Sequence, residues 1–105
     1  MRGDVYRLRA NRAAQGHEQK GPRYAVVVQS DSLPLSTLLV APTSTSARPT
    51  DFRPRIELDG VTTYVLVEQA TAVDAETRLG DHAGRLDASE LDAVDRALAI
   101  VFGLY

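Results

Sequence analysis

The sequence has 105 residues, a net charge of −2 and no cysteine, which predicts one domain over residues 1–105 and excludes a disulfide framework, a thiolate zinc site and a cysteine nucleophile. Hydrophobic residues make up 44% and charged residues 25%, as is typical of a globular protein. The first ten residues lack the apolar stretch of a signal peptide, and no apolar run is long enough to span a bilayer, so we expect a cytoplasmic protein with no membrane partner.

Charge is unevenly distributed along the chain. Residues 1–55 hold nine basic and four acidic residues, a net charge of +5, whereas residues 56–105 hold three basic and ten acidic residues, a net charge of −7. An acidic helix near the C-terminus accounts for part of this difference. The basic half also favours a surface suited to a polyanion, because eleven of the twelve basic residues are arginine and guanidinium groups match phosphate oxygens.

The first two thirds of the chain is predicted to form short strands separated by polar loops. Strands are expected over residues 5–10, 23–29, 37–42, 55–58 and 61–69, with loops over 11–22 and 43–54. The run from Val26 to Val28 indicates a strand that is buried on both faces. Asp59-Gly60 favours a two-residue hairpin turn between two of the strands.

Helical patterns come later in the sequence. Residues 71–80 are predicted to include a short helical turn, opened by Asp74. A longer helix is expected after Asp87, which forms a capping-box pattern with Glu90, and Gly103 is placed to end it. Its apolar stripe consists of Leu91, Val94, Leu98 and Val101. Together, the elements predict a mainly β fold with some α structure: a small SH3-like antiparallel barrel with the C-terminal helix packed against it.

Three polar segments lie at predicted strand ends and could converge on one rim of such a barrel. They contain His17, Glu18, Gln19 and Arg23; Thr43 and Ser44; and Glu68 and Gln69. Each is compatible with ordinary solvated loop structure, which is the commoner role of such segments. Metal binding is not predicted, because His17 and His82 have no spacing that joins them. A serine nucleophile elbow and a phosphate-binding glycine loop are also missing.

In order and spacing, these segments resemble the MazF/PemK family of toxin endoribonucleases. The resemblance includes Arg2-Gly3-Asp4-Val5-Tyr6, Gly16-His17-Glu18-Gln19, Gly21-Pro22-Arg23, Pro42-Thr43-Ser44, Glu68-Gln69 and Arg78-Leu79. It implies a MazF/CcdB-type barrel, a homodimer, and cleavage of single-stranded RNA (messenger, transfer or ribosomal) at short sequences without a metal or cofactor. The implied products carry a 2′,3′-cyclic phosphate and a 5′-hydroxyl. A cognate MazE-like antitoxin is the implied protein partner.

The resemblance also assigns catalytic residues. It maps the family's key arginine onto Arg23 and its key threonine onto Thr43. Arg23 can stabilise the extra negative charge of the phosphorane-like transition state, and Thr43 can hold a phosphate oxygen or the attacking 2′-hydroxyl in line. The proton acceptor is left open between Glu18 and His17, both of which titrate lower than arginine.

RNA contacts are expected around these residues. Unstacked bases are predicted to stack on Tyr6, Tyr24 or Phe52 and to be read by Gln19, Gln29 or Gln69, while Ser44, Arg53 and Arg55 complete the predicted RNA-binding set. Two departures from the family are visible. Tyr24 stands where many relatives have proline, which bears on the cleavage sequence, and Ala70-Thr71-Ala72 lacks an arginine found in relatives.

Two alternative functions are compatible with the same barrel. A gyrase-poisoning toxin of the CcdB type shares the fold but acts through a tryptophan near the end of its C-terminal helix, and this sequence has no tryptophan. An SH3-like module that binds an acidic peptide on the same rim is the other alternative.

Overall fold

The computed structural model describes residues 1–9 and 23–105. Within these two ranges the chain forms seven strands, one 3-10 segment and two helices. Their order and bounds are β1 (Asp4–Leu8), β2 (Arg23–Val27), β3 (Thr37–Ser44), β4 (Arg55–Leu58), β5 (Val61–Val65), η1 (Val67–Gln69), β6 (Thr71–Asp74), α1 (Ala75–Arg78), β7 (Leu79–Arg85) and α2 (Ala88–Phe102).

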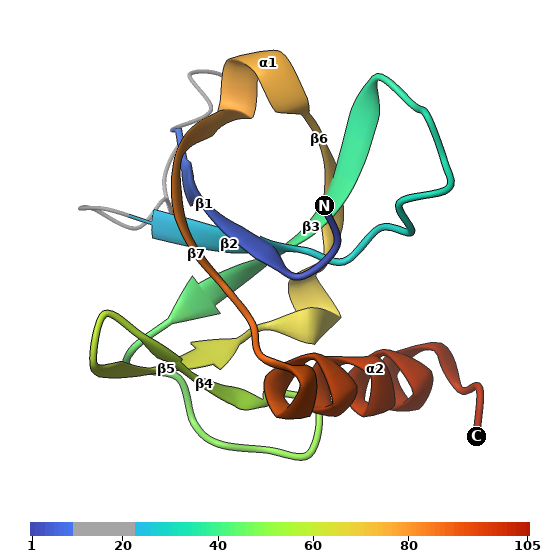
Figure 1. Cartoon of the computed structure of the whole chain (residues 1–105). Helices are drawn as coiled ribbons and strands as arrows, with labels where there is room; N and C mark the ends of the chain where they lie inside the picture. The colour runs from blue at the N-terminus through green and yellow to red at the C-terminus, as the bar shows by residue number, and fades with distance from the viewer. Residues whose placement is uncertain (10–22) are drawn as a thin grey trace, which may run out of the picture.

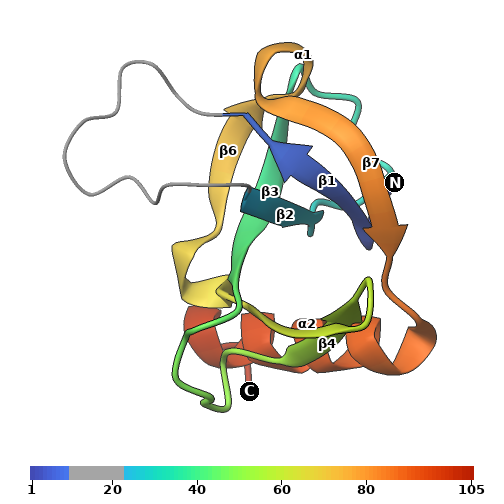
Figure 2. The same cartoon turned by 90° about the vertical axis from the view of Figure 1, so that its left-hand side faces the viewer.

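All strand pairs are antiparallel and belong to one curled sheet. The strand order is β4-β5-β3-β2-β1-β7, and β6 pairs with β3 outside this path. In Figure 1, strands β1, β2, β3, β6 and β7 curl into a barrel with α1 across one end, while the β4–β5 hairpin and α2 lie beneath it (Figure 2). This arrangement confirms the predicted mainly β barrel with a C-terminal helix.

Strand β3 links the two parts of the sheet because its outer edge has two partners. Residues Thr37–Val40 pair with β6, whereas Thr43 and Ser44 pair with Val65 and Tyr64 of β5. Its other edge pairs with β2. The end of β3 therefore lies where the barrel meets the β4–β5 hairpin, which is where the pocket described below is found.

Two hydrophobic clusters stabilise the fold on opposite sides of β2. Val26 and Val28 join the cluster between the sheet and α2, whereas Val27 points into the barrel with Val40 and Val73. All three valines are under 9% exposed, which confirms the predicted burial of this strand on both faces. Burying each such side chain contributes about 1.5–3 kcal/mol.

Helix α2 begins and ends at the predicted residues. The Asp87 carboxylate accepts a hydrogen bond from the Glu90 backbone N–H at 2.7 Å, and the Glu90 carboxylate accepts one from the Asp87 N–H at 3.0 Å. Gly103 ends the helix with a φ of 69°, where a glycine avoids strain. The apolar stripe differs in one position, because Ala97 is buried while Val101 is 37% exposed.

The turn between β4 and β5 has the predicted chemistry. Asp59 and Gly60 have φ angles of 51° and 76°, and Leu58 pairs with Val61 across the turn. Two successive positive φ angles are typical of the type I′ hairpin turn, which matches the right-handed twist of the strands.

Residues 61–85 differ most from the sequence prediction. The strand expected to run to residue 69 ends at Val65, and the chain then forms η1. The predicted helical turn within residues 71–80 is confirmed as α1, which Asp74 caps by accepting a hydrogen bond from the Glu76 N–H at 3.0 Å. Residues 71–74, however, form strand β6. Strand β7 was not predicted. It pairs with β1 through two register shifts, and tertiary pairing overrides its weak strand propensity.

None of the helices in the described ranges is both long and apolar enough to cross a membrane.

Candidate active site

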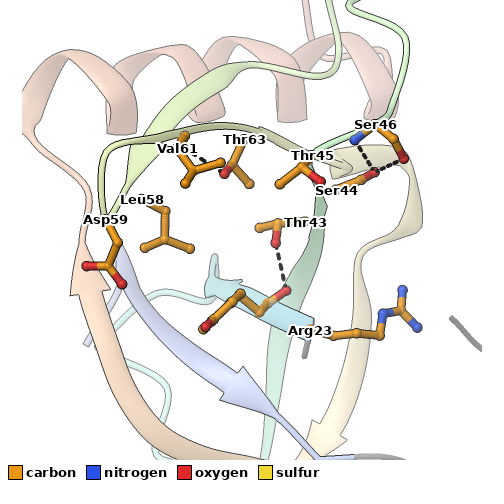
Figure 3. A pocket seen from close by; sticks show the side chains of 10 residues that line it. Arg23, Thr43, Ser44, Thr45, Ser46, Leu58, Asp59, Val61 and Thr63 are labelled. Carbon is orange, nitrogen blue, oxygen red and sulfur yellow. Dashed lines mark hydrogen bonds between the residues drawn. The ribbon is translucent and has the colours of Figure 1, made fainter. Parts of the chain in front are cut away.

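A pocket of about 730 Å³ opens between the ends of β2 and β3 and the β4–β5 hairpin (Figure 3). This volume lies in the usual range for small-molecule and cofactor sites. The lining is a mixture of hydroxyl groups, apolar side chains, one cation and one carboxylate: Arg23, Tyr24, Thr43, Ser44, Thr45, Ser46, Leu58, Asp59, Val61 and Thr63.

The sheet register brings the two predicted catalytic positions into this pocket. Ala25 of β2 lies opposite Pro42 of β3, so the next residues, Tyr24 and Thr43, are neighbours. The Thr43 Oγ1 hydroxyl donates a hydrogen bond to the Tyr24 carbonyl at 3.2 Å, and Thr43 is 6% exposed. Thr43 is therefore held rigidly on the pocket wall, one position from Arg23 of the adjacent strand.

Arg23 is the first residue of β2, and its backbone lies opposite Leu8 of β1. Figure 3 shows its side chain extending away from Thr43. The Arg23 Nε is buried and has no hydrogen-bond partner within residues 1–9 and 23–105. A guanidinium presents five N–H donors and no acceptor, so this position is suited to an anionic ligand such as a phosphate.

The end of β3 supplies a wall of hydroxyl groups. Ser44 Oγ accepts a hydrogen bond from the Ser46 N–H at 3.2 Å and lies 3.4 Å from Ser46 Oγ, which fixes the chain as it leaves the strand (Figure 3). Thr45 lines the pocket between them. The sequence prediction included Ser44 but missed Thr45, Ser46 and Asp59 as lining residues. The run of serine and threonine after β3 was a signal that could have identified the first two. Asp59 was interpreted only as a turn residue.

Gln29 does not belong to this site, which contradicts its predicted base contact. It is 4% exposed. Its Nε2 donates to the Leu33 carbonyl at 3.3 Å, and its Oε1 accepts from the Leu39 N–H at 3.0 Å. Both ends of the amide thus form hydrogen bonds to the backbone after β2, and reading a base would break both of these bonds.

Arg53 lies outside the pocket lining and forms an ion pair with Glu68. Its Nε and Nη2 donate to Glu68 Oε2 at 3.0 and 2.7 Å. Partial burial acts to raise the pKa of Glu68, but the hydrogen bonds and positive charge of Arg53, together with hydrogen bonds from the backbone and Gln69, outweigh it, and the pKa lies below its usual value. The same pair raises the pKa of Arg53. A phosphate would have to compete with Glu68 for this guanidinium.

The three aromatic residues predicted to stack on bases have different environments. Tyr24 lines the pocket and packs against the cluster between the sheet and α2. Phe52 packs against the same cluster, with the Arg53 guanidinium 5.6 Å from its ring centroid. Tyr6 packs in the barrel and makes an edge contact with His82, with ring centroids 5.3 Å apart. Only Tyr24 of the three contributes to the pocket lining.

The Arg2-Gly3-Asp4 segment has a structural role at the base of the barrel. The Asp4 carboxylate is 12% exposed and accepts hydrogen bonds from Arg85 Nη1 at 2.9 Å and from His82 Nε2 at 3.3 Å; the Met1 amino group lies 3.1 Å away. Burial alone would raise the pKa of Asp4, but these donors lower it. The cluster ties β1 to β7 and does not line the pocket.

The remaining predicted residues fall into two groups. Arg55 and Gln69 are exposed and lie outside the pocket lining. His17, Glu18 and Gln19 lie outside the described residues. Within the described ranges, no three histidine, aspartate or glutamate side chains are placed to hold a metal ion together.

Comparisons with known proteins agree on one family. Residues 1–102 match the family described as "PemK-like, MazF-like toxin of type II toxin-antitoxin system". The chain is 43% identical over 104 residues to a Mycobacterium tuberculosis (strain ATCC 25618 / H37Rv) protein named "Putative toxin Rv3098A/RVBD_3098A", covering 99% of this chain and 98% of that protein.

Two solved structures show the same fold. One is an endoribonuclease in complex with its cognate antitoxin from a mycobacterial species, with a TM-score of 0.78, 20% identity, and 100% of this chain and 96% of that chain covered. The other is MazF from Deinococcus radiodurans, with a TM-score of 0.78, 23% identity, and coverage of 97% and 94%. Both likenesses support the barrel-and-helix architecture.

Proposed function

Because this chain belongs to the PemK-like, MazF-like family of toxins of type II toxin–antitoxin systems, we propose that it is a sequence-specific endoribonuclease that cleaves single-stranded RNA without a metal ion. One observation carries the proposal. The chain brings Arg23 and Thr43, from adjacent strands, to a single pocket large enough for part of a nucleotide chain.

Arg23 is proposed to stabilise the transition state. When the 2′-oxygen of one nucleotide attacks the adjacent phosphorus, the phosphorus becomes five-coordinate and its oxygens gain negative charge. Charge-assisted hydrogen bonds from a guanidinium are strongest at that moment. The buried Nε of Arg23, which has no partner among the described residues, gains a hydrogen-bond acceptor when a phosphate oxygen binds there.

Thr43 is proposed to position the nucleophile. Its hydroxyl proton is already directed at the Tyr24 carbonyl, so the lone pairs of Oγ1 remain free to accept a hydrogen bond. This orientation favours contact with the 2′-hydroxyl of RNA, which is a donor, over contact with a phosphate oxygen, which is an acceptor. Holding the 2′-oxygen in line with the departing 5′-oxygen lowers the entropic part of the barrier.

The reaction needs one proton removed and one supplied. The 2′-hydroxyl loses its proton to a base, the new bond forms between the 2′-oxygen and phosphorus, and the bond from phosphorus to the 5′-oxygen breaks. The 5′-oxygen takes up a proton, which leaves a 2′,3′-cyclic phosphate and a 5′-hydroxyl. Glu18 and His17 are the proposed candidates for the base, and both lie outside the described residues.

The proposal extends to the partners of the protein. We propose a homodimer, a cognate MazE-like antitoxin that blocks the RNA groove with an extended acidic segment, and messenger RNA as the principal substrate. These parts rest on family membership. The acidic character of the proposed antitoxin segment fits the basic first half of this chain, which has a net charge of +5 over residues 1–55.

The test is cleavage of a long single-stranded RNA in the presence of EDTA. The wild type is expected to cut at a short recurrent sequence and to leave 5′-hydroxyl ends, which polynucleotide kinase labels without prior phosphatase treatment. The Arg23→Ala variant, purified in the same way, controls for contaminating nuclease. Intact RNA at protein concentrations where a dimer forms, or equal cleavage by both proteins, would overturn the proposal.

A further inference from the structure

The pocket is electrically polar. Of the ten described residues that line it, Arg23 is the sole cation and Asp59 the sole carboxylate. Figure 3 shows them on opposite sides of the pocket, with Thr43 between them. Arg23 comes from the start of β2, whereas Asp59 comes from the tip of the β4–β5 hairpin.

This polarity restricts how a strand of RNA can lie in the pocket. Phosphates are attracted to the Arg23 end and repelled from the Asp59 end, because an ionised carboxylate accepts hydrogen bonds and donates none. A nucleotide whose phosphate lies at Arg23 and whose 2′-hydroxyl lies at Thr43 therefore directs a neutral group towards Asp59. The neutral groups of RNA that carry N–H donors are the bases.

The hairpin turn does not by itself explain an aspartate at this position. Residue 59 has a φ of 51°, a conformation that asparagine and glycine adopt as readily as aspartate. Among the residues described, Asp59 takes part in none of the ion pairs. By contrast, Glu57 on the same hairpin accepts a hydrogen bond from Thr62 Oγ1 at 3.2 Å. The Asp59 side chain is exposed and lines the pocket, so its carboxylate can accept hydrogen bonds from a ligand there.

We propose that Asp59 selects a guanine base in the bound RNA, an inference that rests on the proposed endoribonuclease function. On its Watson–Crick edge guanine carries two adjacent donors, N1–H and N2–H, which match the two oxygens of a carboxylate. Uracil presents one N–H between two carbonyl oxygens, and a carboxylate repels those oxygens. Single-stranded RNA exposes this edge for reading. The hydroxyls of Ser44, Thr45 and Ser46 remain for the sugar and phosphate groups between the two charged ends.

The experiment compares the cleavage sequences of the wild type and Asp59→Asn. Both proteins are incubated with a long RNA of balanced composition, and the new 5′-hydroxyl ends are mapped by sequencing. The wild type is expected to show guanine at one fixed position relative to the cut. Asp59→Asn is expected to lose that enrichment and to cut the guanine-containing site roughly tenfold or more slowly, the discrimination expected of one bidentate base contact.

Controls separate this effect from loss of charge or of fold. Asp51→Asn removes the same charge from an exposed residue outside the pocket, and it is expected to keep the wild-type cleavage sequence. Asp59→Gly gives a second variant without the carboxylate. Glycine adopts the positive φ of residue 59 without strain. Both Asp59 variants are expected to melt within a few degrees of the wild type.

The outcomes distinguish this inference from the proposed function. A wild type that leaves RNA intact overturns the endoribonuclease proposal and the inference with it. A wild type that cuts RNA without a fixed guanine overturns the inference alone. An unchanged guanine preference in Asp59→Asn and Asp59→Gly also overturns the inference alone. The same holds if the position that depends on Asp59 carries a base other than guanine.

Discussion

Replacing Thr43 by valine tests the proposed role of its hydroxyl with little change in shape. Threonine and valine are both β-branched, and valine suits a buried strand position. The change removes the Oγ1 atom that donates to the Tyr24 carbonyl and that we propose accepts a hydrogen bond from the 2′-hydroxyl of RNA. Thr43→Val is therefore expected to remain folded and to cleave RNA slowly.

The expected magnitudes follow from the geometry. Losing one partly buried hydrogen bond costs about 0.5–1.5 kcal/mol of stability. A shift in melting temperature of roughly 4–8 °C per kcal/mol is typical for a domain of this size. A nucleophile that is no longer held in line reacts about 10²-fold more slowly. The expected loss of activity is thus much larger than the expected loss of stability can explain.

Thr43→Ser is the matched control, because it keeps Oγ1 and loses a buried methyl group instead. The lost methyl costs about 0.8 kcal/mol, so the two variants have similar stability. Single-turnover cleavage of a short RNA that contains the mapped site is the assay, with thermal melting on the same preparations. Serine is expected to keep most of the wild-type rate. Equal rates for Thr43→Val and Thr43→Ser would refute the proposed role of the hydroxyl.

Three further predictions concern charged residues. Arg23→Ala is expected to slow cleavage about 10²- to 10³-fold with little effect on the melting temperature. Arg23→Lys is expected to recover only part of that loss, because an ammonium lacks the planar guanidinium fork. A lysine variant that cleaves at the wild-type rate would contradict this. Arg55→Ala is expected to reduce the slope of the log binding constant against log salt concentration by about 0.7, the value for one phosphate on a single strand. Arg53→Ala is expected to change that slope less, because Glu68 already pairs with Arg53. Filter-binding titrations at several salt concentrations measure both slopes. Asp4 has a pKa below its ordinary 3.8 in the fold, so its carboxylate stabilises the protein above that pH, and the stabilisation is lost as pH falls through the folded pKa. Asp4→Asn is expected to be about 1–3 kcal/mol less stable than the wild type at neutral pH, with a difference that shrinks below pH 4; urea unfolding that gives a constant difference at every pH would count against this.

Elements governed by local chemistry could be predicted from the sequence. The capping box of Asp87 and Glu90 fixes the start of α2, and the Asp59-Gly60 pair fixes a turn, because neither depends on distant residues. Strand β7 could not be predicted. Its sequence, LGDHAGR, lacks the alternation and β-branched residues of a strand, and only the open edge of β1 makes it one.

The candidate site was predictable only in part, for a similar reason. Arg23 and Thr43 were found through the resemblance to a family, and the antiparallel β2–β3 pair explains why they meet. The pairing of Arg53 with Glu68 joins residues 15 positions apart, and the burial of Gln29 depends on the turn that follows β2. Neither contact leaves a pattern in the sequence, so both side chains were predicted to face RNA.

The position of Asp59 depends on packing that the unpredicted strand provides. The hairpin tip is anchored by Leu58, which is 9% exposed and belongs to the cluster between the sheet and α2. A Cβ atom at Gly84 of β7 would lie 3.3 Å from the Leu58 Cδ1, so the absence of a side chain at residue 84 lets Leu58 pack this closely. Asp59 follows Leu58 directly. The placement of Asp59 at the pocket therefore depends on the packing of Leu58 against β7 as well as on the turn.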